Sequence, residues 1–410
     1  MFRLAGTILC SFWALQPVFG ASLQHAFSAS TGSLSLNPYP DKPRLAFRAD
    51  RSFKITIFSD LHFGENPDDG VGVVKDSNST RLMRAVLHDE DPDYVVFNGD
   101  LITGDYTFRE NSTLLIDQIM SPLVEAQVPF SSTHGNHDNQ VNITHLEEIQ
   151  REQEIAPSLC YTRTAPLGVG GIGGPGNYWV PIYDALTDTA PSLILWFFDS
   201  RGGVSPTGAP LPDWVDASVS SWIAREMALM NAAWGTPPLG ALAFVHIAPH
   251  AIQALQPPFN SSLELGLNGV FPLDLESIFS DHSTTEDDPL GGGSVQDSNN
   301  IPDAPTPVDI PASEDPLTAS ARDAPFWTAL STIPNLHAII SGHAHGNEWC
   351  TSTDSEGPRF CFNKHSGYGG YDKAGWGHGV RNVQFSPNRV ETWIRLEDGD
   401  TRANLVLSGA

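Results

Sequence analysis

Positive charge and cysteine are both scarce in this sequence. Of its 410 residues, 22 are Lys or Arg and 48 are Asp or Glu, which gives a net charge of -26. So negative a chain repels phosphate backbones and anionic lipids, so we expect no nucleic-acid-binding surface and no anionic-membrane partner. A chain of this kind that handles phosphate therefore needs a metal cation. The apolar fraction of 40% is that of a globular protein with a sizeable core.

Long apolar runs are missing beyond the first residues, so we expect no membrane span in the mature chain. Residues 1–20 carry one early charge, Arg3, and then an apolar stretch that ends in small residues. This pattern is typical of a secretory signal peptide, so we expect a secreted protein. Four N-glycosylation sequons agree with export, and they begin at Asn78, Asn111, Asn142 and Asn260.

Only four cysteines are present, and Cys10 lies in the expected signal peptide. Cys350 and Cys361 are close in sequence, so a local disulfide is the favoured pairing in an oxidising compartment. Cys160 would then be a free and buried thiol. The alternative is three unrelated reduced cysteines.

Short apolar runs alternate with amphipathic stretches along the chain, and this alternation indicates an α/β fold. The apolar runs predict strands at 54–59, 94–97, 128–133, 193–198, 241–245, 336–340, 360–363, 380–385 and 390–396. The amphipathic stretches predict helices at 79–90, 113–126, 143–156 and 215–234.

The domain organisation follows from composition. Residues 21–52 lack a sustained period and are expected to form an extended arm, and residues 53–410 are expected to form one domain. Residues 281–323 are rich in Asp, Glu, Ser, Pro and Gly, so they cannot bury enough apolar surface to offset their ordering entropy. We interpret them as a disordered acidic insertion, with a linker between two domains as the alternative.

Carboxylate, amide and imidazole side chains follow five of the predicted strands. Each group alone is also ordinary turn chemistry, but five turns would rarely all end in metal-ligand residues. Open α/β sheets bind their ligands beyond the carboxyl ends of the strands, so the combination predicts a metal site. Its residues are Asp60, His62, Asp100, Asn136, His246, His343 and His345.

The order and spacing of these groups resemble the motifs of the calcineurin-like metallophosphoesterases, which include the purple acid phosphatases. The motifs are Asp60-x-His62, Gly99-Asp100, Gly135-Asn136-His137-Asp138, His246 and Gly342-His343-x-His345. The later segment with Cys350, Cys361 and the loop Gly367-Tyr-Gly-Gly-Tyr371 resembles the purple acid phosphatase-like branch of secreted and vacuolar proteins in fungi and plants. Secretion or delivery to a vacuole is therefore expected.

This resemblance implies two packed mixed β-sheets flanked by helices, an α/β/β/α sandwich with two metal ions at one edge. It implies Asp60, His62, Asp100 and His345 as ligands of the first metal, and Asp100, Asn136, His246 and His343 as ligands of the second. His137 would be the catalytic acid. Two such cations can clamp phosphate oxygens and acidify a bridging water, so that hydroxide attacks phosphorus. Mn, Fe and Zn suit these ligands about equally.

Two departures from the family pattern have consequences. Purple enzymes place a tyrosine three residues after the bridging aspartate and lack the first-motif histidine, whereas this chain has Thr103 and His62. We therefore expect a colourless metal centre. The Ser/Thr phosphatases place an orienting Asp and an Arg where Thr103 and Gly104 stand, so no arginine clamp can be assigned. Asp105 and Asp138 are both candidates for orienting His137, and His134 and His250 could contact substrate.

The sequence therefore predicts a metal-dependent phosphoesterase that hydrolyses phosphomonoesters. One alternative is a phosphodiesterase or nucleotide hydrolase with the same metals. A second is an inactive secreted binding protein on this fold.

Overall fold

The computed structural model describes residues 36–66, 70–249, 252, 322–352, 359–372 and 375–409. Several predictions concern other parts of the chain: the signal peptide at 1–20, the first part of the arm at 21–52, the acidic insertion up to residue 321, Asn260 and His250. These lie outside the described residues. Within the described ranges, no helix is both long and apolar enough to cross a bilayer.

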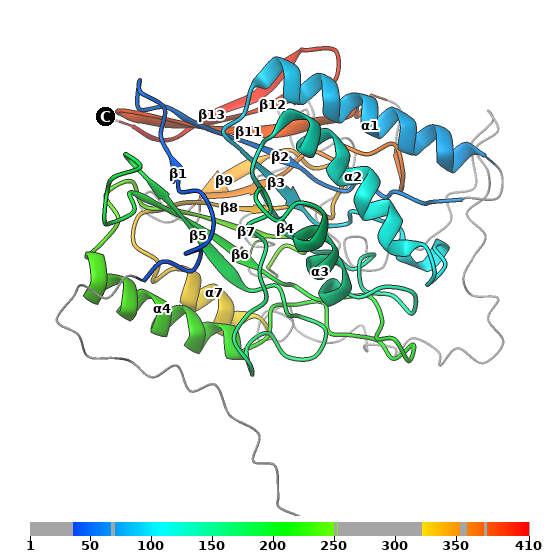
Figure 1. The fold of residues 1–410 in the computed structure, drawn as a ribbon, viewed down its shortest axis with the longest axis horizontal. Helices are drawn as coiled ribbons and strands as arrows, with labels where there is room; N and C mark the ends of the chain where they lie inside the picture. Colours follow the sequence, from blue (N-terminus) through cyan, green and yellow to red (C-terminus); the bar gives the residue numbers. More distant parts are fainter. Residues whose placement is uncertain are drawn as a thin grey trace, which may run out of the picture. The chain divides into compact units, whose positions relative to one another are not determined.

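Two mixed β-sheets form the centre of the fold (Figure 1). The seven-stranded sheet has the order β1 (Leu45–Ala46), β5 (Tyr178–Tyr183), β6 (Leu193–Phe198), β7 (Ala241–Val245), β8 (Leu336–Ser341), β10 (Arg359–Phe362) and β9 (Cys350–Ser352). The six-stranded sheet has the order β13 (Thr401–Gly409), β12 (Arg389–Leu396), β11 (Gly379–Ser386), β2 (Phe53–Phe58), β3 (Tyr94–Asn98) and β4 (Phe130–Thr133).

Neighbouring strands run parallel where the predicted site residues follow them. β2, β3 and β4 are parallel neighbours in one sheet, and β6, β7 and β8 are parallel neighbours in the other. The carboxyl ends of parallel strands meet at one edge of a sheet, which brings together residues that are far apart in sequence.

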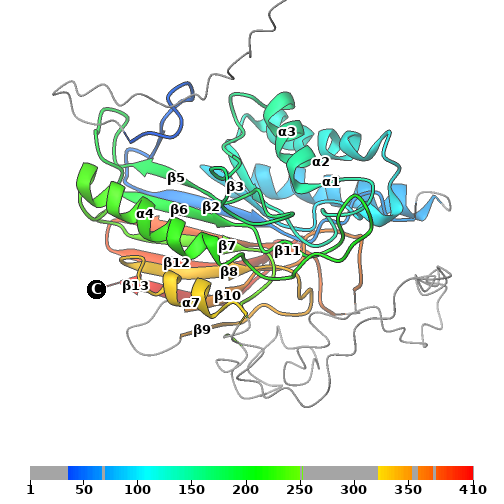
Figure 2. The same ribbon diagram turned by 90° about the horizontal axis from the view of Figure 1, so that it is seen from below.

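Helices cover the outer face of each sheet (Figure 2). α1 (Val71–Glu90) and α2 (Ser112–Ala126) pack on the six-stranded sheet, with α3 (His145–Ile155) beside α2. α4 (Ser218–Trp234) and α7 (Ala324–Leu330) pack on the seven-stranded sheet. Side chains of both sheets, such as Ile57 and Phe244, share one buried cluster between them. The predicted α/β/β/α sandwich is confirmed.

The predicted start of the first helix was wrong. Sequence alone suggested a helix that begins at Ser79 or Thr80, but α1 begins at Val71, directly after Gly70 in a left-handed conformation. Ser79 does not cap a helix end, because its hydroxyl donates to the Lys75 carbonyl inside the helix at 3.1 Å. A serine that bonds to the preceding turn is tolerated inside a helix. Because serine is also a common helix cap, the predicted start of the helix lay eight residues too late.

The cysteines and sequons can be compared with the structure. Cys350 and Cys361 lie opposite each other on β9 and β10 and form a disulfide, as predicted, and Cys160 is free and buried. Among the sequons, Asn111 is exposed. Asn142 is half-buried and donates from its side-chain amide to the Thr107 carbonyl at 2.5 Å. A glycan on Asn142 would replace that hydrogen bond.

Candidate metal centre

The ends of five strands deliver the predicted site residues to one place. Asp60 and His62 follow β2, Asp100 follows β3 and Asn136 follows β4. His246 follows β7, and His343 and His345 follow β8. Backbone hydrogen bonds hold these loops together: the amides of Asp60 and Leu61 donate to the carbonyls of Gly99 and Asp100 at 2.9 and 2.8 Å.

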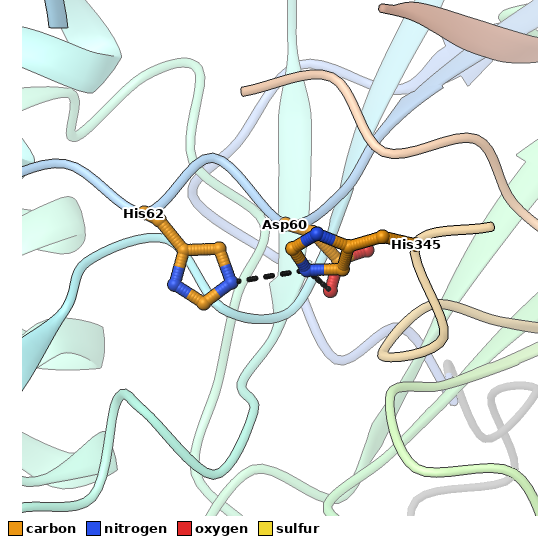
Figure 3. Close-up of side chains that lie close together, drawn as sticks. All are labelled: Asp60, His62 and His345. Carbon is orange, nitrogen blue, oxygen red and sulfur yellow. Dashed lines mark hydrogen bonds and ion pairs between the residues drawn. The ribbon is translucent and has the colours of Figure 1, made fainter. Parts of the chain in front are cut away.

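Six of these residues form two neighbouring groups of three. Asp60, His62 and His345 make one, and Asp100, His246 and His343 make the other, with the atoms of each group within 4.8 Å of one another. In the first group His62 Nε2 lies 3.2 Å from His345 Nε2, which lies 3.6 Å from Asp60 Oδ1 (Figure 3). Asp100 Oδ2 faces both groups, at 3.7 Å from His62 Nε2 and 3.1 Å from His246 Nε2. Asp100 Oδ2 therefore lies between the two groups.

Each of three histidines is oriented by a hydrogen bond at its Nδ1 atom. His246 Nδ1 bonds to the Asn98 carbonyl at 2.8 Å, and His345 Nδ1 bonds to the Tyr371 carbonyl at 2.6 Å. His62 Nδ1 lies 3.2 Å from the Thr103 hydroxyl. A bond at Nδ1 fixes the ring and leaves Nε2 for a metal, which is the usual arrangement around ligating histidines.

The two carboxylates also brace the loops. One oxygen of Asp100 accepts the His137 amide at 2.9 Å, and one oxygen of Asp60 accepts the His343 amide at 3.0 Å. Each aspartate thus ties its own loop to the loop of another motif. Asp100 Oδ1 is used in this way, so Oδ2 is the oxygen that faces the histidines.

Four of the converging residues have a left-handed backbone, a conformation that costs a non-glycine residue on the order of 1 kcal/mol or more. They are Asp60 (φ 55°), His62 (φ 49°), Asp100 (φ 51°) and His343 (φ 70°). Strained residues of this kind cluster at functional sites, where the surrounding fold holds them in place.

The buried polar atoms of this cluster fit a bound cation. Among the described residues, Asn136 Oδ1 is buried without a hydrogen-bond partner, and His246 Nε2 is buried with only Asp100 Oδ2 facing it at 3.1 Å. Burial, with the neighbouring Asp100 charge, raises the pKa of Asp60 to about 7. Burial lowers the pKa of His62 to about 3, which keeps its imidazole neutral. Imidazoles, buried carboxylates and an unpartnered amide oxygen are the donor set of a transition-metal site.

His137 stands beside the cluster, half-buried, with its ring 4.9 Å from that of His62. Its Nδ1 atom lies 3.5 Å from Asp105 Oδ1. Burial lowers the pKa of His137, but the carboxylates of Asp100 and Asp105 outweigh this and raise it to about 9. The side chain can therefore hold a proton at neutral pH.

The two candidates for orienting His137 have different surroundings. Asp105 faces the His137 ring, as described above. Asp138 is fully buried and accepts hydrogen bonds from the amides of Leu101, Ile102 and Gly135 at 2.8 to 3.1 Å. Asp138 therefore fixes the loops after β3 and β4, and the geometry favours Asp105 next to the imidazole.

His134 does not join the cluster. Its Nε2 atom lies 3.3 Å from Glu152 and 3.8 Å from Glu148, both on α3, and all three side chains are fully buried. The structure instead reveals a supporting pair that the sequence did not predict. His145 bonds to Asp199 at 3.0 Å and to the Gly135 carbonyl at 2.8 Å. Asp199 follows β6, so the rule that found the other residues at strand ends also applies to it.

Comparison with known proteins agrees with this geometry. A family model described as calcineurin-like phosphoesterase matches residues 53–199. This chain resembles the calcineurin-like phosphoesterases, as its sequence predicted. The matched segment contains Asp60, His62, Asp100, Asn136 and His137, and the remaining residues of the cluster come from β7 and β8.

Three proteins similar to this chain carry phosphatase names. Probable inactive purple acid phosphatase 28 of Arabidopsis thaliana is 23% identical over 404 residues, covering 92% of this chain and 88% of the relative. Phosphatase DCR2 of Saccharomyces cerevisiae is 28% identical over 192 residues, covering 44% of this chain and 32% of the relative. Among solved structures, a dimetal phosphatase from Danio rerio aligns with a TM-score of 0.49 and 12% identity, covering 87% of this chain and 99% of that one.

Proposed function

We propose that this chain is a metal-dependent phosphoesterase that hydrolyses phosphomonoesters. The observation that carries the proposal is that six metal-ligand side chains, from the ends of four strands, form two groups of three, with Asp100 Oδ2 facing histidines of both groups. In this proposal Asp60, His62, Asp100 and His345 hold one cation, and Asp100, Asn136, His246 and His343 hold the other. A cation pair supplies Lewis-acid polarisation of the phosphate and an activated water.

The residues of the chain contribute positioning and a proton. Nδ1 hydrogen bonds hold His62, His246 and His345 with Nε2 turned toward the cluster. His137, beside the cluster, donates a proton to the leaving oxygen or stabilises the transferring phosphoryl group. Asp105 keeps that imidazole protonated and oriented. Asp60, His62 and Asp100 are buried, and electrostatic interactions are stronger between groups that are shielded from water.

The test measures hydrolysis of an aryl phosphate and the metal content of the purified protein. We expect Asp100→Ala and His343→Ala to reduce hydrolysis to background and to lower the metal content, because each removes a ligand. His88→Ala is the control, since His88 is a surface histidine with 88% of its side chain exposed. Unchanged turnover in Asp100→Ala would contradict the proposal.

The same assay separates the alternatives. Faster hydrolysis of a bis-aryl phosphate than of the mono-aryl ester would favour a phosphodiesterase. Tight binding of phosphate esters without turnover, with every metal and pH tested, would favour an inactive binding protein. The name of one relative, a probable inactive purple acid phosphatase, is a reason to test this alternative. Analysis of the bound metal distinguishes Mn, Fe and Zn, and a colourless protein is expected because Thr103 stands where purple enzymes have tyrosine.

A further inference from the structure

A second histidine cluster lies on the glycine-rich loop between β10 and β11. His365 stands near the start of this loop and His378 at its end, and the amide of Gly379 donates to the His365 carbonyl at 3.2 Å, so the loop closes on itself. The two imidazole rings are 4.8 Å apart at an angle of 72°. Asp372 comes from the middle of the loop and faces both rings.

The distances within this cluster are those between ligands of one cation. His365 Nε2 lies 3.4 Å from Asp372 Oδ1, and His378 Nε2 lies 3.4 Å from Asp372 Oδ2. A charged hydrogen bond is normally about 2.7–2.9 Å long. Ligands about 2.0–2.1 Å from a tetrahedral zinc lie roughly 3.3 Å from one another. The facing side-chain atoms around Asp100 have a similar spacing, because Asp100 Oδ2 lies 3.1 Å from His246 Nε2 and 3.7 Å from His62 Nε2.

We propose that His365, Asp372 and His378 bind a further divalent cation of the zinc type. This cation is separate from those of the proposed phosphoesterase centre around Asp100, which we call the main centre. Two imidazoles and one carboxylate form the donor set of a three-ligand zinc site whose fourth position is taken by water. Access for that water is available on the aspartate side, because 39% of the Asp372 side chain is exposed whereas His365 is fully buried.

Packing holds the two imidazoles in position before any cation binds. The Tyr368 ring stacks on His378 with centroids 3.9 Å apart, and the Trp376 ring contacts the edge of His365 at 6.0 Å. His365 Nε2 is buried, and no described residue forms a hydrogen bond with it. Rings that packing already holds in place lose less side-chain freedom when a cation binds, so they favour binding.

The other nitrogen of His365 decides between a metal site and a hydrogen-bonded triad. Nδ1 lies 3.0 Å from the His345 carbonyl, and donation to that oxygen leaves a lone pair on Nε2 for a cation. Lys364 Nζ lies 2.8 Å from the same Nδ1 and 3.3 Å from Glu348. If Lys364 donates to Nδ1, then Nε2 carries the proton and donates to Asp372, and no cation is required.

A cation bound by His365, Asp372 and His378 would also stabilise the orientation of His345 in the main centre. Asp372 follows Tyr371, whose carbonyl accepts from His345 Nδ1 at 2.6 Å and whose ring stacks on His345 with centroids 4.0 Å apart. Fixing Asp372 therefore fixes the residue that orients a proposed ligand. Loss of such an orienting partner typically lowers metal affinity about 10–100-fold. This role rests on the proposed function, whereas the existence of the site does not.

The test counts zinc in the full-length protein after equilibration with Zn²⁺ and gel filtration. The first comparison is wild type against Asp372→Asn, which keeps the shape of the side chain. We expect the variant to hold one zinc fewer. Asp89→Asn is the matched control, because Asp89 also pairs with a histidine, His88, at 2.9 Å, but both are exposed on the surface. Its zinc content should equal that of the wild type.

A second comparison measures the zinc content in variants that lack the Asp100 carboxylate of the main centre. The variant Asp100→Asn is compared with the double variant Asp100→Asn/Asp372→Asn, and the proposal expects the second to hold one zinc fewer than the first. This result would stand even if the chain hydrolysed no phosphate ester, so the two proposals fail separately. Equal zinc content in this pair, with circular dichroism showing both folded, would overturn the proposal and assign His365, Asp372 and His378 to a hydrogen-bonded triad. His378→Asn replaces Asp372→Asn if that variant does not fold.

Discussion

The main cluster and the cluster of His365, Asp372 and His378 are built on different kinds of backbone. The residues of the main cluster follow β2, β3, β4, β7 and β8, across both sheets. The second cluster draws all three residues from the single loop between β10 and β11. The first therefore depends on the folding of the whole domain, and the second depends on how one loop closes. Changes at strand ends should act strongly on function, and changes in the loop should act in smaller steps.

The largest expected effect comes from Gly135→Ala at the end of β4. A methyl group there would lie 2.2 Å from Asp100 Oδ1 and 2.6 Å from His246 Nε2, distances at which atoms cannot coexist. Either the loop or both ligands must move, so we expect hydrolysis to fall to background and the metals of the main centre to be lost. Metal analysis and an aryl phosphate assay check this. Near-normal turnover in a folded variant would show that the strand ends tolerate movement.

A smaller effect is expected from His137→Asn, which removes the proposed acid but none of the proposed ligands. General acid catalysis contributes about 10²–10⁴-fold, so kcat should fall by that factor while both metals remain bound. Steady-state kinetics with parallel metal analysis measures this. The comparison with Gly135→Ala separates loss of the proton donor from loss of the cations. A decrease of less than about fivefold would exclude His137 as the proton donor.

Much of this contrast was predictable from the sequence. Apolar runs such as Leu193–Phe198 bounded the strands closely, and the polar residues that follow them identified the members of the main cluster. The bounds of the strands and the residues that follow them can be read from the local pattern of apolar and polar residues. His365, Asp372 and His378 could not be grouped in the same way, because a loop with five glycines among residues 367–377 has no period from which side-chain directions follow.

Other features escaped prediction for physical reasons of their own. The early start of α1 depends on Gly70 in a left-handed conformation, which composition does not reveal. β5 was missed because Pro181 lies inside it. Pro181 pairs only with Ile194 of β6, since β1 pairs with Ile182 and Tyr183 beyond it, so one side of Pro181 needs no ladder hydrogen bond. The choice between Asp105 and Asp138 as partner of His137 depends on three backbone amides that meet Asp138, and these become neighbours only in the folded chain.

Substitutions of Asp105 and Asp138 separate their two roles. Asp105→Asn should lower kcat about tenfold with little change in KM or melting temperature, because Asp105 faces the imidazole and its side chain is 39% exposed. Asp138→Asn is the matched comparison. It places an amide NH₂ against three backbone donors, so it should lower the melting temperature by several degrees. The reverse pattern, with kcat sensitive only to Asp138 and stability only to Asp105, would exchange the two roles.

The smallest effect is expected from Tyr371→Phe in the loop. The Tyr371 hydroxyl accepts from the His345 amide at 3.0 Å and donates to the His343 carbonyl at 3.3 Å, while the stacked ring and the carbonyl that orients His345 are retained in phenylalanine. A hydrogen bond contributes about 1 kcal/mol net, which corresponds to roughly fivefold in metal affinity. We expect that loss at limiting metal, with full recovery of turnover at excess metal. If excess metal fails to restore turnover, the hydroxyl acts on substrate rather than on the ligands, and the loop would then share the functional role that we assign to the strand ends.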